Sequence, residues 1–285
     1  MLPNTHGRRC PRIDMAMAWL GACLTLMASS AFAAEPAQTP AAPAPATDLS
    51  RVHQSIARGQ TFLADLFDSS MELLPEFRGS KTFWLFHDNY LAAHLLEGTK
   101  PELSRRIRGT LHRFGVTNSG KIEIVFDESP QALPFRTYQL TNVSSVAGKV
   151  IKTEIVTTNL LKGWQEYADL LLFASVAERS TAPQSARLNF DRAAAMWDGT
   201  GFRDRVVVKA GQYATYKLAL YLIAADRLRL TPPHRREVTE RLLGLQAGEG
   251  GWRTDYNAAA PLGLANVETT CLALLALQGI ERRGD

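Results

Sequence analysis

The sequence predicts an all-α fold of about four helical hairpins, with a small antiparallel β insertion at about residues 118–157. Four segments are apolar on nearly every side, and each follows an aromatic residue and a polar cluster. A helix that is apolar all round must be buried, so we expect these four to be inner helices. Their starts, near Tyr90, Tyr167, Tyr216 and Thr270, are 77, 49 and 54 residues apart. The two shorter intervals fit one hairpin each, and the first is longer by about the length of the β insertion.

Caps and periodicity predict the remaining elements. Asp48 can cap a first helix whose apolar residues recur with a period near 3.6. Residues 121–127 alternate apolar and polar side chains, which is typical of a strand, and residues 136–143 and 149–157 are rich in β-branched and aromatic residues. We expect an irregular loop between Trp252 and the last helix.

Residues 1–33 have the features of an export signal. Three arginines precede a short apolar stretch, and an A-F-A tripeptide that ends at Ala33 offers a cleavage site. The stretch is too short to span a membrane. An L-G-A-C motif ending at Cys23 allows an alternative, a lipoprotein anchored at that cysteine. We therefore expect a secreted or periplasmic protein, or one anchored at Cys23.

Residues 34–47 are rich in alanine and proline, which is typical of an extended tether, and residues 48–285 are expected to form the folded domain. Loss of the signal would remove three arginines and one aspartate and lower the formal charge from +4 to about +2. So small a charge gives no reason to expect nucleic acid binding. Cys271 would be the one remaining thiol, so no intramolecular disulfide is expected.

A motif near the C-terminus resembles a known repeat. Residues 246–252 fit the pattern Q-x-x-x-G-x-W, and Asn266 and Glu268 then precede an apolar run that ends at Leu277. This layout resembles the QW repeats of the terpenoid cyclases and protein prenyltransferases, and the outline of the chain is similar to six-hairpin glycosidases. The resemblance implies a partial or compact α/α toroid. It also implies a ligand site where the N-termini of the inner helices gather.

Such a site would bring together carboxylates, amides, aromatic rings and a lysine, which suit the binding and acid–base chemistry of sugars. The candidate catalytic residues are Asp88, Asp255 and Glu268, with Asp88 and Asp255 expected to form an acid/base pair. The candidate substrate-binding residues are Trp84, His87, Asn89, Tyr90, Asp204, Tyr213, Lys217, Trp252, Tyr256 and Asn266. No metal site and no cofactor are expected.

Each candidate also has a structural interpretation. Asp88, Asn89, Asn266 and Glu268 stand where helix caps belong, and a cap contributes about 1 kcal/mol without any ligand. The tryptophans can pack between hairpins instead of binding substrate. Both interpretations remain open for these residues.

Three function classes follow. The first is an exported glycoside hydrolase or polysaccharide lyase acting on carbohydrate, and the second is a non-catalytic envelope protein that binds a ligand or partner. The third is a relative of the terpenoid cyclases, although the chain has no D-x-D-D acid and no histidine after His234 to complete a prenyltransferase zinc site. The expected partner is a small molecule or oligosaccharide, and the oligomeric state is left open.

Overall fold

The computed structural model describes residues 48–284, apart from 116–120, 129–132 and 134. The predicted export signal, tether and lipid-anchored Cys23 lie outside the described residues. Within the described part, nine α-helices accompany two three-stranded sheets, with 52% helix and 20% strand. The predicted fold class, an all-α partial or compact α/α toroid, is therefore wrong, because the chain mixes α and β structure.

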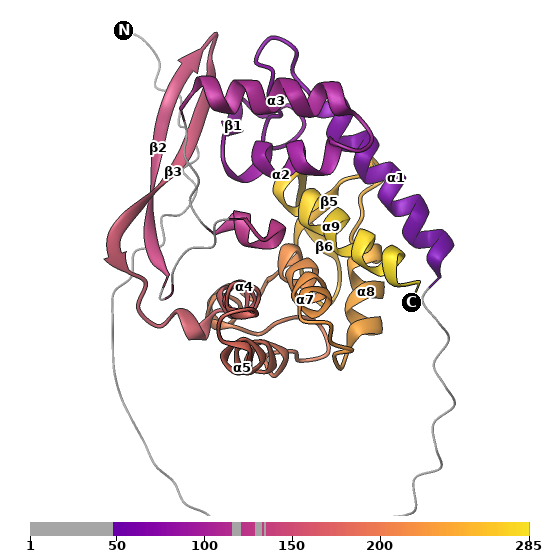
Figure 1. Cartoon of the computed structure of the whole chain (residues 1–285). Helices are drawn as coiled ribbons and strands as arrows, with labels where there is room; N and C mark the ends of the chain where they lie inside the picture. Colours follow the sequence, from indigo (N-terminus) through magenta and orange to yellow (C-terminus); the bar gives the residue numbers. More distant parts are fainter. Residues whose placement is uncertain (1–47, 116–120, 129–132, 134, 285) are drawn as a thin grey trace, which may run out of the picture. The chain divides into compact units, whose positions relative to one another are not determined.

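Four apolar helices lie in a row through the core. In the order of their contacts these are α2 (His87–Leu96), α9 (Val267–Arg283), α7 (Thr215–Arg227) and α4 (Ala168–Glu178). Each packs against a second helix that carries more polar residues. Figure 1 shows the helices of each pair side by side. These partners are α3 (Pro101–Arg113), α1 (Leu49–Leu66), α8 (Arg235–Gly244) and α5 (Pro183–Ala194) in the same order, and a short α6 (Arg205–Ala210) precedes α7.

Residues at each end of α9 determine where this helix begins and ends. The side chain of Asn266 accepts a hydrogen bond from the backbone N–H of Thr269 at 2.9 Å, which caps the first turn. Its interior from Cys271 to Leu277 is buried. At its end, Gly284 adopts a φ of 73°, which is unstrained in glycine.

The first sheet has the order β1-β3-β2 and lies beside the start of α2. β1 (Thr82–Trp84) pairs parallel with β3 (Lys149–Leu160), which pairs antiparallel with β2 (Arg136–Val146). Phe83 and Ile151, which are paired across β1 and β3, are both buried. Because β1 leads directly into α2, this sheet fixes the start of that helix.

Residues 121–127 do not form the predicted strand. Ile122–Phe126 is instead a 3-10 helix, η1 in the chain order, and a second one, η2, spans Trp164–Glu166. Side chains from Ile122 to Val125 are buried consecutively, which a strand with one wet face does not allow. Asp127 ends η1 in the left-handed region, at φ 64°.

The second sheet replaces the irregular loop expected after Trp252. β5 (Trp252–Tyr256) lies between β4 (Tyr213–Ala214) and β6 (Pro261–Asn266), and both pairings are antiparallel. Pairing across the sheet places Tyr213 beside Tyr256, and their rings stack with centroids 5.4 Å apart. The end of β6 is the cap of α9, so this sheet fixes the start of that helix.

The Q-x-x-x-G-x-W segment joins α8 to α1 and β5. Trp252 is fully buried, and its indole Nε1 donates to a backbone oxygen of α8 at 2.8 Å. The Gln246 amide donates to the backbone oxygens of Ser55 at 2.9 Å and Gly250 at 2.7 Å. Gly250 has a φ of 102°, and a Cβ there would lie 2.5 Å from the backbone oxygen of Arg58, so no other residue fits without distortion.

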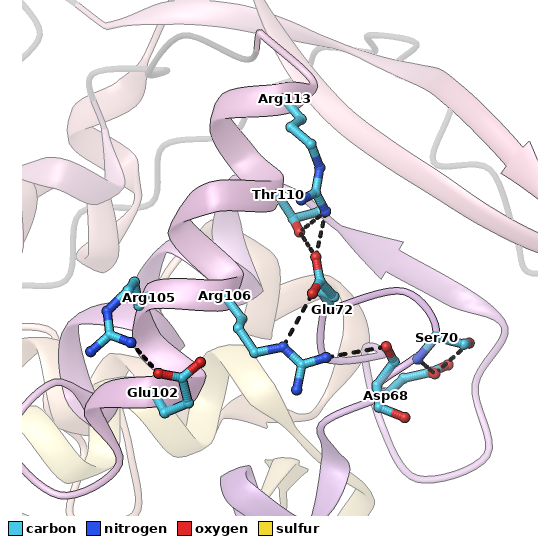
Figure 2. A network of polar contacts seen from close by, with 9 residues as sticks. Asp68, Ser70, Glu72, Glu102, Arg105, Arg106, Thr110 and Arg113 are labelled. Atoms are coloured by element: carbon cyan, nitrogen blue, oxygen red, sulfur yellow. Dashed lines mark hydrogen bonds and ion pairs between the residues drawn. The ribbon is translucent and has the colours of Figure 1, made fainter.

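A polar network holds the loop between α1 and β1 against α3. Figure 2 shows the Glu72 carboxylate accepting hydrogen bonds from Arg106 Nε at 3.1 Å, Thr110 Oγ1 at 3.2 Å and Arg113 Nη2 at 2.5 Å. The bonds from Arg113 and Arg106 lower the pKa of Glu72. Further along, the backbone oxygen of Glu76 accepts from the N–H of Val267 at 3.0 Å, which ties this loop to the start of α9.

Candidate functional site

A pocket of about 280 Å³ lies where the first turns of three helices meet the first sheet. We call it the acidic pocket. Its lining residues are Glu76, Trp84, His87, Asp88, Lys121, Glu154, Tyr216, Asn266 and Glu268.

Helix starts supply most of this lining. α2 contributes His87 and Asp88, α7 contributes Tyr216, and α9 contributes Glu268 together with its cap Asn266. The N-terminal end of a helix exposes unpaired N–H groups, so each adds partial positive charge to the pocket.

The first sheet and two connecting segments complete the walls. Trp84 ends β1 and is half-buried, with the Lys152 ammonium 5.6 Å from its ring centroid. Glu154 lies on β3, Glu76 on the loop after α1, and Lys121 just before η1. The lining therefore holds four carboxyl groups and one ammonium group.

Asp88 is a nearly dry carboxyl group in the wall, with 2% of its surface exposed. Burial raises its pKa well above the usual value, and the charges of Glu268 and Glu76 raise it further. A hydrogen bond from the backbone N–H of Glu268 acts in the opposite direction. The other oxygen, Oδ2, has no hydrogen-bond partner among the described residues.

Glu268 is partly exposed to the pocket and has a pKa close to neutrality. Burial raises this pKa to about 7, and nearby charges on Glu154, Asp169 and Glu76 add to the rise while Lys121 opposes it. The carboxyl group is thus present in both protonation states near pH 7. Such a group can give or accept a proton at the working pH of most proteins.

His87 and Glu154 face each other across the pocket wall, with Nε2 3.5 Å from Oε2. Burial, aided by the charge of Lys121, lowers the pKa of His87 to about 3, so the imidazole is neutral at pH 7. Burial raises the pKa of Glu154, and Lys121 opposes this. Because His87 is neutral, the contact is not an ion pair at neutral pH.

Tyr216 connects the pocket to α4 behind it. Its hydroxyl donates to Asp169 Oδ2 at 3.0 Å, and burial together with the Asp169 charge raises the pKa of the phenol well above 10. The hydroxyl therefore stays protonated and fixed in direction.

Five of the predicted site residues meet in the acidic pocket, namely Trp84, His87, Asp88, Asn266 and Glu268. Asp255 does not line this pocket. It lies in β5, the central strand of the second sheet, where it is paired with Ala214 and Leu262. The predicted acid/base pair of Asp88 and Asp255 is thus not assembled. The carboxyl group next to Asp88 is Glu268.

Asp204 and Lys217 are placed elsewhere, as a buried ion pair with 0% and 3% of their side chains exposed. Asp204 also caps α6 through the N–H of Val206 at 3.0 Å and accepts from the N–H of Ala168 at 3.1 Å. These bonds occupy the carboxylate fully, so its role is structural.

Asn89 and Tyr90 also have structural partners. The Asn89 amide accepts from the N–H of Leu74 at 2.7 Å and donates to the backbone oxygen of Trp84 at 2.9 Å. The Tyr90 ring packs against Phe86, and its hydroxyl binds Glu128. Asn89 therefore holds β1 in place instead of facing the pocket.

Three predicted aromatic contacts with substrate are absent from the acidic pocket. Trp252 is buried beneath the turn that precedes it. Tyr213 donates to Asp198 Oδ2 at 2.5 Å, and Tyr256 donates to the backbone oxygen of Thr200 at 3.1 Å. Tyr256 lines a separate hollow of about 460 Å³ between α8 and the β5–β6 loop.

Glu76, Lys121, Glu154 and Tyr216 line the pocket but were not among the predicted site residues. Tyr216 has the same sequence signal as Asp88, because both begin apolar helices. Glu154 is an acidic residue within a run of β-branched residues, and this interruption of the pattern is a sequence signal. Glu76 and Lys121 carry no local signal, because their position depends on the course of long loops.

In comparisons with known proteins, no family model matches the chain, and no significant match is found among curated proteins or solved structures. Within residues 48–284 and outside the undescribed gaps, no helix is long and apolar enough to cross a membrane. The described side chains also form no group of three or more histidine, cysteine, aspartate or glutamate residues suited to holding a metal ion.

Proposed function

We propose that the acidic pocket is a general acid–base site for a small hydroxyl-rich molecule, with carbohydrate as the ligand class. The observation that carries this proposal is the Glu268 carboxyl group, which lines an open pocket with a pKa of about 7 beside the buried carboxyl group of Asp88, whose pKa burial also raises. Enzymes that cleave or rearrange glycosides commonly use a pair of carboxyl groups with different proton affinities.

The pocket residues divide into two roles. Glu268 gives or takes the proton, since it is the carboxyl group that is both reachable and near half-ionised at pH 7. Asp88, whose buried Oδ2 has no hydrogen-bond partner among the described residues, binds a polar group of the ligand. The half-buried Trp84 ring and the fixed Tyr216 hydroxyl supply an apolar face and a polar anchor for a sugar ring.

The polar lining argues against a hydrocarbon substrate. Carboxyl, ammonium, amide and hydroxyl groups would be desolvated by an isoprenoid chain without gaining hydrogen bonds, which is unfavourable. A cyclase-like activity is therefore not proposed. Binding without turnover at the same pocket is the alternative that the experiment below separates from catalysis.

The test is a panel of oligosaccharides, scored for released reducing ends and unsaturated uronate products with the wild type, Glu268→Gln and Asp255→Asn. Glu268→Gln keeps the side chain's shape and removes its proton chemistry, so we expect turnover to fall by about a hundredfold or more. Asp255→Asn, outside the pocket, should stay within about twofold of the wild type. Ligand binding with no turnover would leave a binding protein, and neither binding nor turnover across the panel would refute the proposal.

A further inference from the structure

The acidic pocket carries more negative than positive charge when its carboxyl groups are ionised. Four carboxyl groups line it, while Lys121 is the one charged amine in the lining and His87 is neutral. The Lys121 ammonium group also contacts the Tyr138 ring, whose centroid lies 4.7 Å from Nζ. The starts of α2, α7 and α9 each add roughly half a positive charge. With all four carboxyl groups ionised, negative charge remains in excess even after the three helix starts are counted.

Two carboxyl oxygens in the wall have unused hydrogen-bonding capacity. Asp88 Oδ2 and Glu154 Oε2 are shielded from solvent and have no hydrogen-bond partner among the described residues. Asp88 is almost entirely buried, yet it lines the pocket. Buried acceptors of this kind are rare in folded proteins, because losing water without gaining a donor is unfavourable. A ligand that brings several N–H donors would satisfy both oxygens.

We infer that the ligand of the acidic pocket carries a protonated amine, so that within the proposed function it is an amino sugar and not a uronate. An ammonium group has three donors and no acceptor, which matches the oxygens of Asp88, Glu154 and Glu268. A uronate carboxylate would instead add a negative charge to four existing carboxyl groups. This inference rests on the proposed function for the sugar part of the ligand.

Ammonium binding should be coupled to proton release. An ammonium group favours the ionised carboxylates, so binding lowers the proton affinity of Glu268. The charged or titratable groups around Glu268 come from several elements: Glu76 on the loop, His87 and Asp88 on α2, Lys121 before η1, Glu154 on β3, Asp169 on α4, Tyr216 on α7 and Cys271 on α9 itself. Between pH 5.5 and 7 the ionised fraction of a group with a pKa of about 7 rises roughly fifteenfold. Affinity for the amine should rise by about that factor over this range.

The experiment is calorimetric titration of the whole exported protein with glucosamine, glucose and N-acetylglucosamine, with ethanolamine as an amine that lacks the ring. We expect glucosamine to bind at least about tenfold more tightly than either neutral sugar and than ethanolamine, with protons released on binding. Equal affinity for glucosamine and glucose would overturn the amine inference while leaving the proposed function intact. Ethanolamine binding as tightly as glucosamine would overturn the amino sugar assignment. No binding of any sugar, with no turnover in the oligosaccharide panel, would refute the proposed function itself.

A pair of variants assigns the effect to the pocket. Glu154→Gln removes one wall charge and should weaken glucosamine binding by about tenfold, with a smaller effect on glucose, so that the preference for glucosamine over glucose falls. Asp255→Asn removes one carboxylate outside the pocket and should change the binding of neither sugar. A Glu154→Gln protein that melts like the wild type and binds glucosamine with wild-type affinity would contradict the inference.

Discussion

Glu268 and Asp88 lie on different helices, yet the charge of Glu268 raises the pKa of Asp88, and the charge of Glu76 raises the pKa of both carboxyl groups. Desolvation is the largest cause of both rises in pKa, and the charge of Glu154 adds to the rise at Glu268. A folded protein that keeps such groups does so at a cost in stability, because the unfolded chain ionises them freely in water. This cost is measurable and provides a test that needs no ligand.

The first prediction concerns the pH dependence of that cost. The pKa of Glu268 is raised from 4.5 to about 7, so the folded state holds its proton more tightly than the unfolded state does. The free energy of unfolding therefore loses a contribution as the pH rises from 4.5 to 7, by up to about 3 kcal/mol. Glu268→Gln cannot ionise, so its stability relative to the wild type should increase over this range and level off above pH 7. Chemical denaturation at several pH values measures this.

The quantity to compare is the difference in unfolding free energy between the wild type and Glu268→Gln. His87 makes this necessary, because its effect on the pH dependence of stability is opposite to that of Glu268. The pKa of His87 is lowered to about 3, so its contribution to stability is present above pH 6.5 and is lost as the pH falls towards 3. That contribution is the same in both proteins and cancels. Glu102→Gln, on the exposed surface of α3, serves as the control and should show no comparable pH-dependent gain. A flat difference between wild type and Glu268→Gln from pH 4.5 to 8 would show that Glu268 has an ordinary pKa.

The second prediction separates the buried ion pair from the site. Asp204→Asn leaves the Lys217 ammonium buried without a counter-charge, and we expect a loss of about 3–5 kcal/mol in unfolding free energy. The double variant Asp204→Asn with Lys217→Met removes both charges and should recover part of the loss. If the double variant is as unstable as the single one, the hydrogen bonds of Asp204 and not the ion pair dominate.

Some site residues were predictable from the sequence because local signals determine their place in the chain. Asp88, Asn266 and Glu268 are at helix starts, which caps and apolar runs mark locally, and the structure places all three in the acidic pocket. Asp204 carries the same local signal, yet it faces Lys217 in the core. A cap signal places a residue at a helix end, but tertiary packing decides which way that end points.

At the scale of elements, the helices were predictable and the second sheet was not. Apolar runs long enough for several turns mark α4, α7 and α9, and the structure has helices there. β5 and β6 are short, and side chains from Arg253 to Asp255 are all only half-buried, so no period-two pattern stands out. β4 has two residues and exists only because β5 pairs with it. Such pairing depends on partners that are distant in the sequence.

The third prediction tests the turn that joins α8, α1 and β5. Trp252 is fully buried and donates a hydrogen bond to α8, so Trp252→Ala should lower the free energy of unfolding by about 3–5 kcal/mol through the cavity that it leaves. Trp197→Ala is the control, because Trp197 is half-buried at the rim of a surface hollow and should cost clearly less. Equal losses at both positions would mean that Trp252 contributes no more to the free energy of unfolding than a half-buried surface tryptophan does.

At the scale of the whole molecule, the chain has to be stable without disulfides if it is exported. Cys271 is fully buried in α9, and burial raises the pKa of its thiol well above the usual value, so it should react slowly while the protein is folded. The other two cysteines lie in residues 1–33, the predicted export signal. Counting thiols in the protein recovered from cells therefore reports on processing and on folding together.

The fourth prediction uses that count. Cleavage after Ala33 would leave Cys271 as the sole cysteine, so the exported protein should begin at Ala34 and take up one alkyl group when denatured, and nearly none when native. Its melting temperature should not change on addition of a reductant, because no disulfide can form within a chain of one cysteine. A lipoprotein would also take up one alkyl group, since the Cys23 thiol would be blocked, but its mass would include residues 23–33 and a diacylglycerol. Three alkyl groups in the recovered protein would mean that the signal is not removed. Intact-mass spectrometry before and after alkylation distinguishes these three results in one sample.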